Sequence, residues 1–183
     1  MGKNGTASKR WVALFTCPVT RAIHMEVMKN MSAEAFMQTF RRFVCRRRRP
    51  DFMSSDNAKN FVLASKLIQE NSNQDEKPLK WQFITPEAPW QGSVYERMVG
   101  VVKRTLQRAV KKNLLEEGEF TTLINEIEFL VNERLLVDYE RDGEQVLCPG
   151  DFLWPDYNMR RIHWNMRTIC MRMTNRTYLF SKI

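Results

Sequence analysis

The chain has 183 residues, 43% hydrophobic and 27% charged, which suffices for the core of one domain and excludes disordered and fibrous classes. Lysine and arginine outnumber aspartate and glutamate by 29 to 21, so the net charge of +8 indicates a polyanionic partner, nucleic acid before an acidic membrane surface. Four dispersed cysteines, two distant histidines and no apolar run of about 18 residues argue against a disulfide scaffold, a zinc module and a membrane span.

The N-terminal part of the chain predicts a β-hairpin. Residues 1–9 are polar and lack periodicity, so we expect a disordered lead-in. Two runs rich in Val, Ile, Phe and Trp then flank a Cys-Pro-Val-Thr-Arg turn, which is typical of strands at about 10–17 and 21–28. His24 falls in the second run, and we expect it on the strand surface rather than at a metal.

A helix and a short strand follow the hairpin. Ser32 can cap a helix from residue 33 to about 47, which should stop before Pro50. The sequence DFMSSDN then predicts a brief buried strand that ends at residue 54 or 55. Its carboxyl end delivers Asp56.

The second half of the chain predicts two longer helices. Periodicity favours a helix over 58–70 and a strand over 79–85, and PEAPWQGS reads as a loop. Long helices are expected from about 93 to 112 and from about 119 to 137. We therefore expect one domain over 10–137, followed at 138–183 by a charged linker, a loop with aromatic anchors and a basic tail whose helix or strand character stays open.

Strands and helices in this order belong to an α/β fold, in which functional groups gather at strand ends. Asp56 ends the short strand and Glu96 is expected in the first turn of the long helix, so a metal-bridging carboxylate pair is feasible across 40 residues. Small and polar residues share the helical face of Glu96, and cationic residues adjoin it. That face suits a phosphodiester backbone, with its cations supplied by Lys103, Arg104 and Arg108.

At these residues the chain resembles the integrase catalytic core of long-terminal-repeat retroelements, specifically the BEL/Pao type. The likeness covers roughly residues 11–135, with several motifs in the family's order. The matching stretches are WVALFTCPVTRAIHMEV, the RRF of 41–43 with its arginine run, SSDNAKNF around Asp56, APWQGSVYERMVGVVKR and INEIEFLVNER.

The resemblance implies an RNase H-like fold, a mixed sheet flanked by helices, and metal-dependent phosphodiester hydrolysis and DNA strand transfer. In the family, three carboxylates hold two divalent ions, Mg²⁺ or Mn²⁺. Asp56 matches the second carboxylate and Glu96 the third. The first, on a central strand upstream of the hairpin, has no match here, which implies a chain truncated at its N-terminus and inactive alone. The expected nucleic-acid contacts are Asn60, Lys103, Arg104, Gln107 and Arg108.

Alternative interpretations stay open at this stage. Asp56 can simply close an Asx turn, Glu96 can be a first-turn acid, and Asn60 an ordinary polar residue of a helix start. The arginine run at 46–49 can be a nuclear-localisation signal, a phosphate clamp or a solvated helix end. The whole chain can be a non-catalytic nucleic-acid-binding or oligomerising module of this origin. We expect DNA and a second copy of the chain as partners, no membrane or small-molecule substrate, and a nuclear or cytoplasmic protein that is not secreted.

Overall fold

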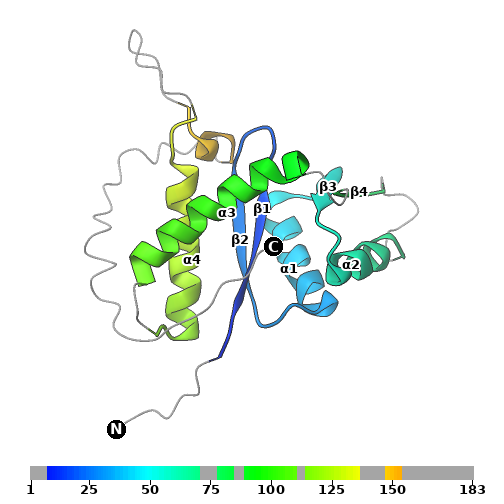
Figure 1. Ribbon diagram of the computed structural model, residues 1–183, viewed down its shortest axis with the longest axis horizontal. Coiled ribbons are helices and arrows are strands. Elements are labelled where there is room, and N and C mark those ends of the chain that lie inside the picture. Colours follow the sequence, from blue (N-terminus) through cyan, green and yellow to red (C-terminus); the bar gives the residue numbers. More distant parts are fainter. Residues whose placement is uncertain (1–7, 71–77, 85–88, 111–113, 137–146, 154–183) are drawn as a thin grey trace.

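The computed structural model describes residues 8–70, 78–84, 89–110, 114–136 and 147–153. These residues form a mixed α/β structure (Figure 1). No helix among them has the length and apolarity that a bilayer span requires. The elements are β1 (Trp11–Thr16), β2 (Ile23–Met28), α1 (Ala33–Arg47), β3 (Phe52–Ser55), α2 (Lys59–Glu70), β4 (Lys80–Phe83), α3 (Pro89–Val110), α4 (Glu117–Asn132) and η1 (Pro149–Phe152).

The described strands form two separate sheets. Strands β1 and β2 make the predicted antiparallel hairpin, in a register that pairs Leu14 with Met25. The Cys17 N–H closes the turn by donating to the Ala22 carbonyl at 2.8 Å. Strands β3 and β4 pair in parallel, as expected for strands joined through a helix, here α2.

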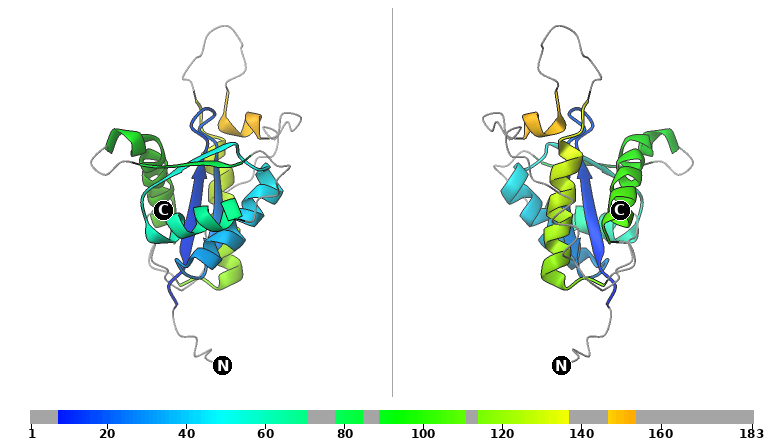
Figure 2. Two further views of the ribbon diagram at one scale, coloured as in Figure 1. Left: turned by 90° about the vertical axis from the view of Figure 1, so that its right-hand side faces the viewer. Right: turned by 90° about the vertical axis from the view of Figure 1, so that its left-hand side faces the viewer.

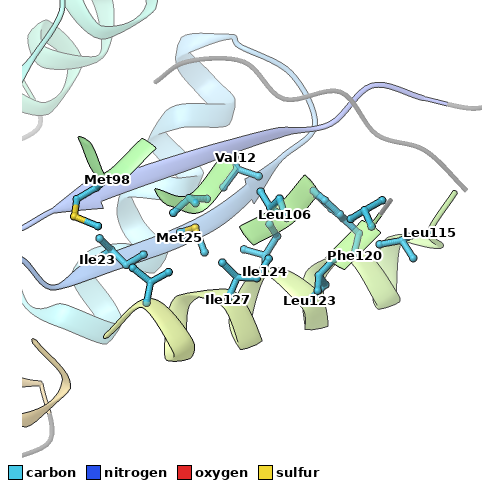
Figure 3. Packing of buried hydrophobic residues seen from close by; sticks show 13 residues of the cluster. Val12, Ile23, Met25, Met98, Leu106, Leu115, Phe120, Leu123, Ile124 and Ile127 are labelled. Carbon is cyan, nitrogen blue, oxygen red and sulfur yellow. The ribbon is translucent and has the colours of Figure 1, made fainter. Parts of the chain in front are cut away.

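Helices cover both faces of the hairpin, with α1 and α2 on one face and α3 and α4 on the other (Figures 1 and 2). Side chains alternate between the faces: Val12 and Met25 contribute to the cluster with α3 and α4, whereas Ala13 and Met28 contribute to the cluster with α1 and α2. Figure 3 shows the first cluster, which is centred on buried residues of α4 such as Phe120. The hairpin is therefore buried on both faces.

Helix α4 closes the outer edge of β2 with two side chains one turn apart. Asn132 accepts from the Ile23 N–H at 2.8 Å and donates to the Ile23 carbonyl at 2.9 Å. Glu128 Oε2 accepts from the Met25 N–H at 2.7 Å. These bonds engage three backbone groups that the edge of β2 would otherwise leave without partners.

The opposite edge of the hairpin, along β1, is not closed in this way. Hydrogen bonds alternate in an antiparallel pair, so the backbone groups of Val12, Leu14 and Thr16 face away from β2. No described residue pairs with them. All six residues of β1 are uncharged, which is typical of an interior strand. The described residues thus leave open the position beside β1 where the resemblance places the central strand.

The two long helices differ from their predicted bounds. Helix α3 begins at Pro89 and not near residue 93, because proline lacks only an N–H that the first helical turn leaves unpaired. Helix α4 ends at Asn132 instead of about residue 137. Beyond this point the backbone no longer follows the helical pattern, since the Leu136 N–H donates to the Leu147 carbonyl at 2.9 Å and not to the carbonyl of residue 132.

The segment after α4 contains a short helix where the sequence predicts a loop. Pro149–Phe152 form η1, which packs on the end of α4. The Cys148 N–H donates to Asp151 Oδ2 at 2.7 Å and starts this turn. Residues 138–146 and 154–183, which include the basic tail, lie outside the described residues.

Candidate metal and nucleic-acid site

Asp56 lies directly after β3, as the sequence predicts, and its side chain is exposed. Its Oδ1 accepts a hydrogen bond from the Ala58 N–H at 3.1 Å, which makes an Asx turn before α2 begins at Lys59. No described residue bonds to its Oδ2, and Lys59 makes no ion pair with it among the described residues. The turn interpretation is confirmed, and it leaves one carboxylate oxygen available for a ligand.

Neighbouring side chains fix the end of β3 on which Asp56 depends. The Trp81 indole N–H donates to Ser55 Oγ at 3.0 Å, and the Ile84 N–H donates to the Ser55 carbonyl at 2.9 Å. Asn57 Nδ2 donates to the Ile84 carbonyl at 2.6 Å. Because the residues on both sides of Asp56 are anchored to β4 and the residue after it, the position of its backbone is well defined.

Glu96 lies on α3 with an exposed side chain. The sequence prediction places it in the first turn, but the earlier start at Pro89 puts it about two turns into the helix, so the helix dipole does not explain an acid there. The predicted apolar stripe on the opposite face is confirmed, since Met98, Val102 and Leu106 are buried in the core. Glu96 therefore faces away from the core.

Tyr95 precedes Glu96 on α3 and is partly buried. Burial raises the pKa of its phenol above the usual range, and the negative charges of Glu96 and Asp56 raise it further. The sequence analysis did not single out Tyr95.

Two exposed carboxylates suit one hydrated Mg²⁺ or Mn²⁺, because Mg²⁺ keeps several waters and takes one or two carboxylates from a protein. A cluster of three or more His, Cys, Asp or Glu side chains does not occur among the described residues. A shared ion at Asp56 and Glu96 therefore stays a prediction of the sequence analysis.

The residues expected to contact nucleic acid lie on two helices. Asn60, in the first turn of α2, is half-buried, and its Nδ2 is buried without a hydrogen-bond partner. Gln107 is exposed on α3. Around it lie the residues that we call the α3 basic face, of which Lys103 is half-buried and the two arginines are exposed: Lys103, Arg104 and Arg108.

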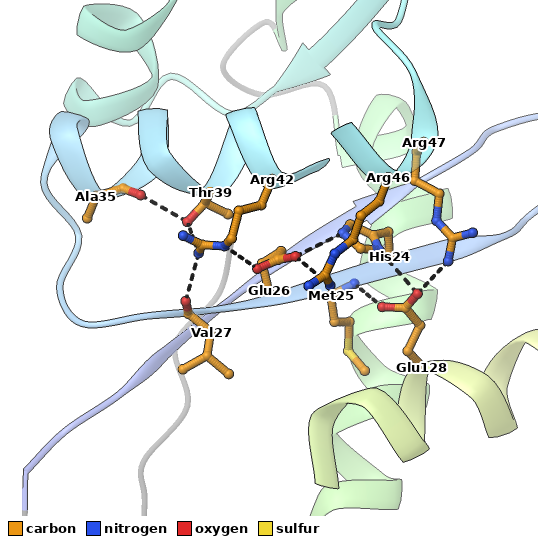
Figure 4. A network of polar contacts seen from close by, with 10 residues as sticks. All are labelled: His24, Met25, Glu26, Val27, Ala35, Thr39, Arg42, Arg46, Arg47 and Glu128. Atoms are coloured by element: carbon orange, nitrogen blue, oxygen red, sulfur yellow. Dashed lines mark hydrogen bonds and ion pairs between the residues drawn. The ribbon is translucent and has the colours of Figure 1, made fainter. Parts of the chain in front are cut away.

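Sequence reasoning missed a polar network beneath α1, shown in Figure 4. The expectation that His24 lies on the strand surface is wrong: the residue is 4% exposed, because α1 and α4 cover this part of β2. Its Nδ1 lies 3.1 Å from Glu128 Oε1, and its Nε2 lies 3.3 Å from Glu26 Oε1. Its partner on α4 is 104 residues away, so no local pattern could have indicated the contact.

Arginines of α1 complete this network. Arg42 Nε donates to Glu26 Oε2 at 2.6 Å, and Arg46 Nη1 lies 3.0 Å from Glu26 Oε1. Arg47 donates to Glu128 Oε1 at 2.7 Å. Burial raises the pKa of both carboxyl groups, but the bonds from His24 and these arginines outweigh it and hold both pKa values below the usual range. The first two arginines of the run at 46–49 are therefore tied into the fold.

No family model and no curated protein matches the chain. Among solved structures, a chain of the simian T-cell lymphotropic virus intasome in complex with PP2A regulatory subunit B56 gamma matches with a TM-score of 0.58 and 10% identity. The match covers 80% of this chain and 54% of that one, so our chain spans about half its length. The HTLV-2 integrase catalytic core domain in complex with magnesium (dimeric form) matches with a TM-score of 0.53 and 10% identity, over 80% of this chain and 95% of that one. At this identity the likeness shows the fold, the RNase H-like α/β architecture of integrase catalytic cores.

Proposed function

We propose that the chain is an integrase catalytic-core fragment from the Pol polyprotein of a BEL/Pao-type retrotransposon, which binds DNA and one divalent metal ion. The observation that carries this proposal is the likeness of the fold to integrase catalytic cores, with an exposed carboxylate directly after β3, Asp56, and another on the outer face of α3, Glu96.

Mg²⁺ or Mn²⁺ bound in such a core activates the attacking water or 3′-hydroxyl and stabilises the leaving oxygen of a phosphodiester. Asp56 and Glu96 are the residues that hold the ion in our proposal. The Asx turn fixes the Asp56 carboxylate, and the hydrogen bond from Trp81 to Ser55 anchors the end of β3 that precedes it. The magnesium named with the HTLV-2 core supports this choice of ion.

We further propose that the chain does not catalyse strand transfer by itself. Two-ion chemistry places the ions about 3.5–4 Å apart, which needs more carboxylate oxygens than two side chains offer. The described residues contain no third acid in a potential metal cluster. Glu26 cannot replace it, because His24 and two arginines already engage its carboxylate.

The proposed DNA contacts are Asn60, Gln107 and the α3 basic face. Cations that neutralise phosphates release counterions, so binding weakens with salt at a log–log slope of about −0.9 per phosphate on duplex DNA. The membership of the simian virus chain in an intasome supports DNA as the partner. The dimeric form of the HTLV-2 core supports a second copy of the chain as a further partner.

A second candidate function is a non-catalytic DNA-binding module of the same origin. The described residues contain no cluster of three acids, and this favours the module. In that case the basic surface works without any contribution from Asp56 and Glu96.

The two candidates separate in one set of assays on the full chain. Fluorescence anisotropy with labelled duplex DNA measures binding at several salt concentrations, with and without Mg²⁺ or Mn²⁺, and a strand-transfer assay measures turnover. The variants are Asp56→Asn, Glu96→Gln and, as a matched control, the exposed Glu70→Gln on α2.

Our proposal predicts salt-dependent binding that the metal strengthens, a loss of this metal effect in Asp56→Asn and Glu96→Gln, and no turnover. Turnover that Glu96→Gln abolishes would show an active enzyme and overturn the inactivity. Binding that neither metal nor either variant changes identifies the module. A flat salt response contradicts both candidates.

A further inference from the structure

The network around His24 presents a carboxylate oxygen to each ring nitrogen. Both distances, 3.1 Å at Nδ1 and 3.3 Å at Nε2, lie within the range of an ion pair. Nδ1 makes a hydrogen bond with Glu128 Oε1, whereas Nε2 and Glu26 Oε1 form an ion pair without hydrogen-bond geometry. A neutral imidazole turns a lone pair toward one of these carboxylates, whereas an imidazolium presents a positively charged N–H to each. The arrangement around His24 therefore suits the protonated ring.

Neither Glu26 nor Glu128 carries the proton of this arrangement. Arg42 and Arg46 hold Glu26, while Arg47 and the Met25 N–H hold Glu128, so both acids are fixed as anions. The proton shared in the network belongs to the histidine.

The surroundings of the ring are otherwise apolar. The Phe43 ring lies 5.6 Å from the imidazole, centroid to centroid, and the Phe15 ring lies 6.2 Å away. Burial lowers the pKa of His24, and the charge of Arg47 lowers it too, but the interactions with Glu128 and Glu26 prevail, and the net pKa is raised. The charged groups around the ring are Glu26 from β2, Glu128 from α4, and Arg42, Arg46 and Arg47 from α1.

We propose that His24 is a proton-dependent clamp that joins α1, β2 and α4, so that the folded state loses stability when the ring gives up its proton. The imidazolium bridges Glu26 and Glu128, and each of these acids carries an arginine of α1. When the ring loses its proton, a lone pair of one ring nitrogen faces a carboxylate, and the contacts of His24 with Glu26 and with Glu128 both become weaker.

The direction of the pH effect follows from linkage. The unfolded histidine titrates at about 6.5, and the folded one titrates above that. Its stabilisation is complete below about pH 6.5 and is lost as the pH rises through the folded pKa. For each unit between the two pKa values, the unfolding equilibrium constant of the protein rises about tenfold across this window.

A titration of the ring protons by NMR tests the clamp on the full chain. His163 is the other histidine of the sequence, so His163→Gln assigns the signals. We expect the His24 midpoint above about 6.5, and a fall by about one unit in Glu128→Gln, the size expected when an opposite charge nearby is removed. The exposed Glu70→Gln is the control and should leave the midpoint unchanged.

Unfolding between about pH 6 and 9 supplies the second readout. The wild type should lose stability over this range, and His24→Gln should respond far less. A midpoint at or below about 6.5, or one that Glu128→Gln leaves in place, overturns the proposal, and so does a parallel loss of stability in wild type and His24→Gln. If His24→Gln does not fold, the titration of Glu128→Gln decides.

Discussion

Replacement of Asn132 by alanine should strongly destabilise the fold, because this one side chain closes the edge of β2. Asn132 is fully buried and bonds to both the N–H and the carbonyl of Ile23, at 2.8 and 2.9 Å. The variant leaves two backbone groups of a strand residue that is 1% exposed without partners. Each such group costs about 1–3 kcal/mol, so we expect a loss of about 2–6 kcal/mol for the two.

This loss is a large part of the total, since domains of this kind are stable by about 5–15 kcal/mol. Urea unfolding followed by circular dichroism measures the free energy of unfolding. Asn125→Ala is the matched control, because Asn125 is exposed on the same helix and should change the value by no more than about 0.5 kcal/mol. An Asn132→Ala variant as stable as Asn125→Ala would refute the view that α4 closes this edge.

Three further predictions concern the core, the acid limit of stability and the basic surface. Phe36→Ala should reduce the free energy of unfolding by about 3–5 kcal/mol in urea titrations, because the ring is 2% exposed and lies 4.9 Å from that of Phe61; Phe52→Ala, at an exposed position, should have little effect. Glu26 and Glu128 have lowered pKa values, so their stabilisation is present above about pH 4.3 and is lost as the pH falls through the folded values; the variant with glutamine at both positions lacks this stabilisation and should unfold at a higher pH than the wild type on acidification, and an unmoved midpoint would contradict this. Alanine at all three positions of the α3 basic face should flatten the salt dependence of DNA binding in anisotropy assays. The control replaces three exposed lysines elsewhere by alanine, Lys29, Lys66 and Lys80. An equal effect of the control would show that the net charge of the chain, and not this face, sets the salt dependence.

Local signals predicted much of the fold. Ser32 caps α1 as expected, with its Oγ accepting from the Ala35 N–H at 3.1 Å, and the helix ends at Arg47, before Pro50. The two apolar runs of the hairpin predict strands that include the observed β1 and β2. The sequence predicts the start of α3 too late, because PEAPWQGS is typical of a loop although the first turn of a helix accepts proline.

Local sequence patterns do not predict contacts between residues that are far apart in the chain. The ring of His24 sits in a strand pattern that fits a surface position equally well, and its burial depends on α4, more than 100 residues later. The arginine run at 46–49 fits a localisation signal, a phosphate clamp or a solvated helix end, and only the fold places Glu26 and Glu128 against its first two arginines. The pairing of Asp56 with Glu96 follows from their places at a strand end and on the long helix, and the resemblance adds their roles.

The most direct test of our account is the binding of Mn²⁺ to the full chain, followed by electron paramagnetic resonance. If Asp56 and Glu96 share one ion, Asp56→Asn and Glu96→Gln should each lose most of the binding, and the double variant should lose no more than either alone. Binding that survives either single replacement, or losses that add independently in the double variant, would contradict a common site.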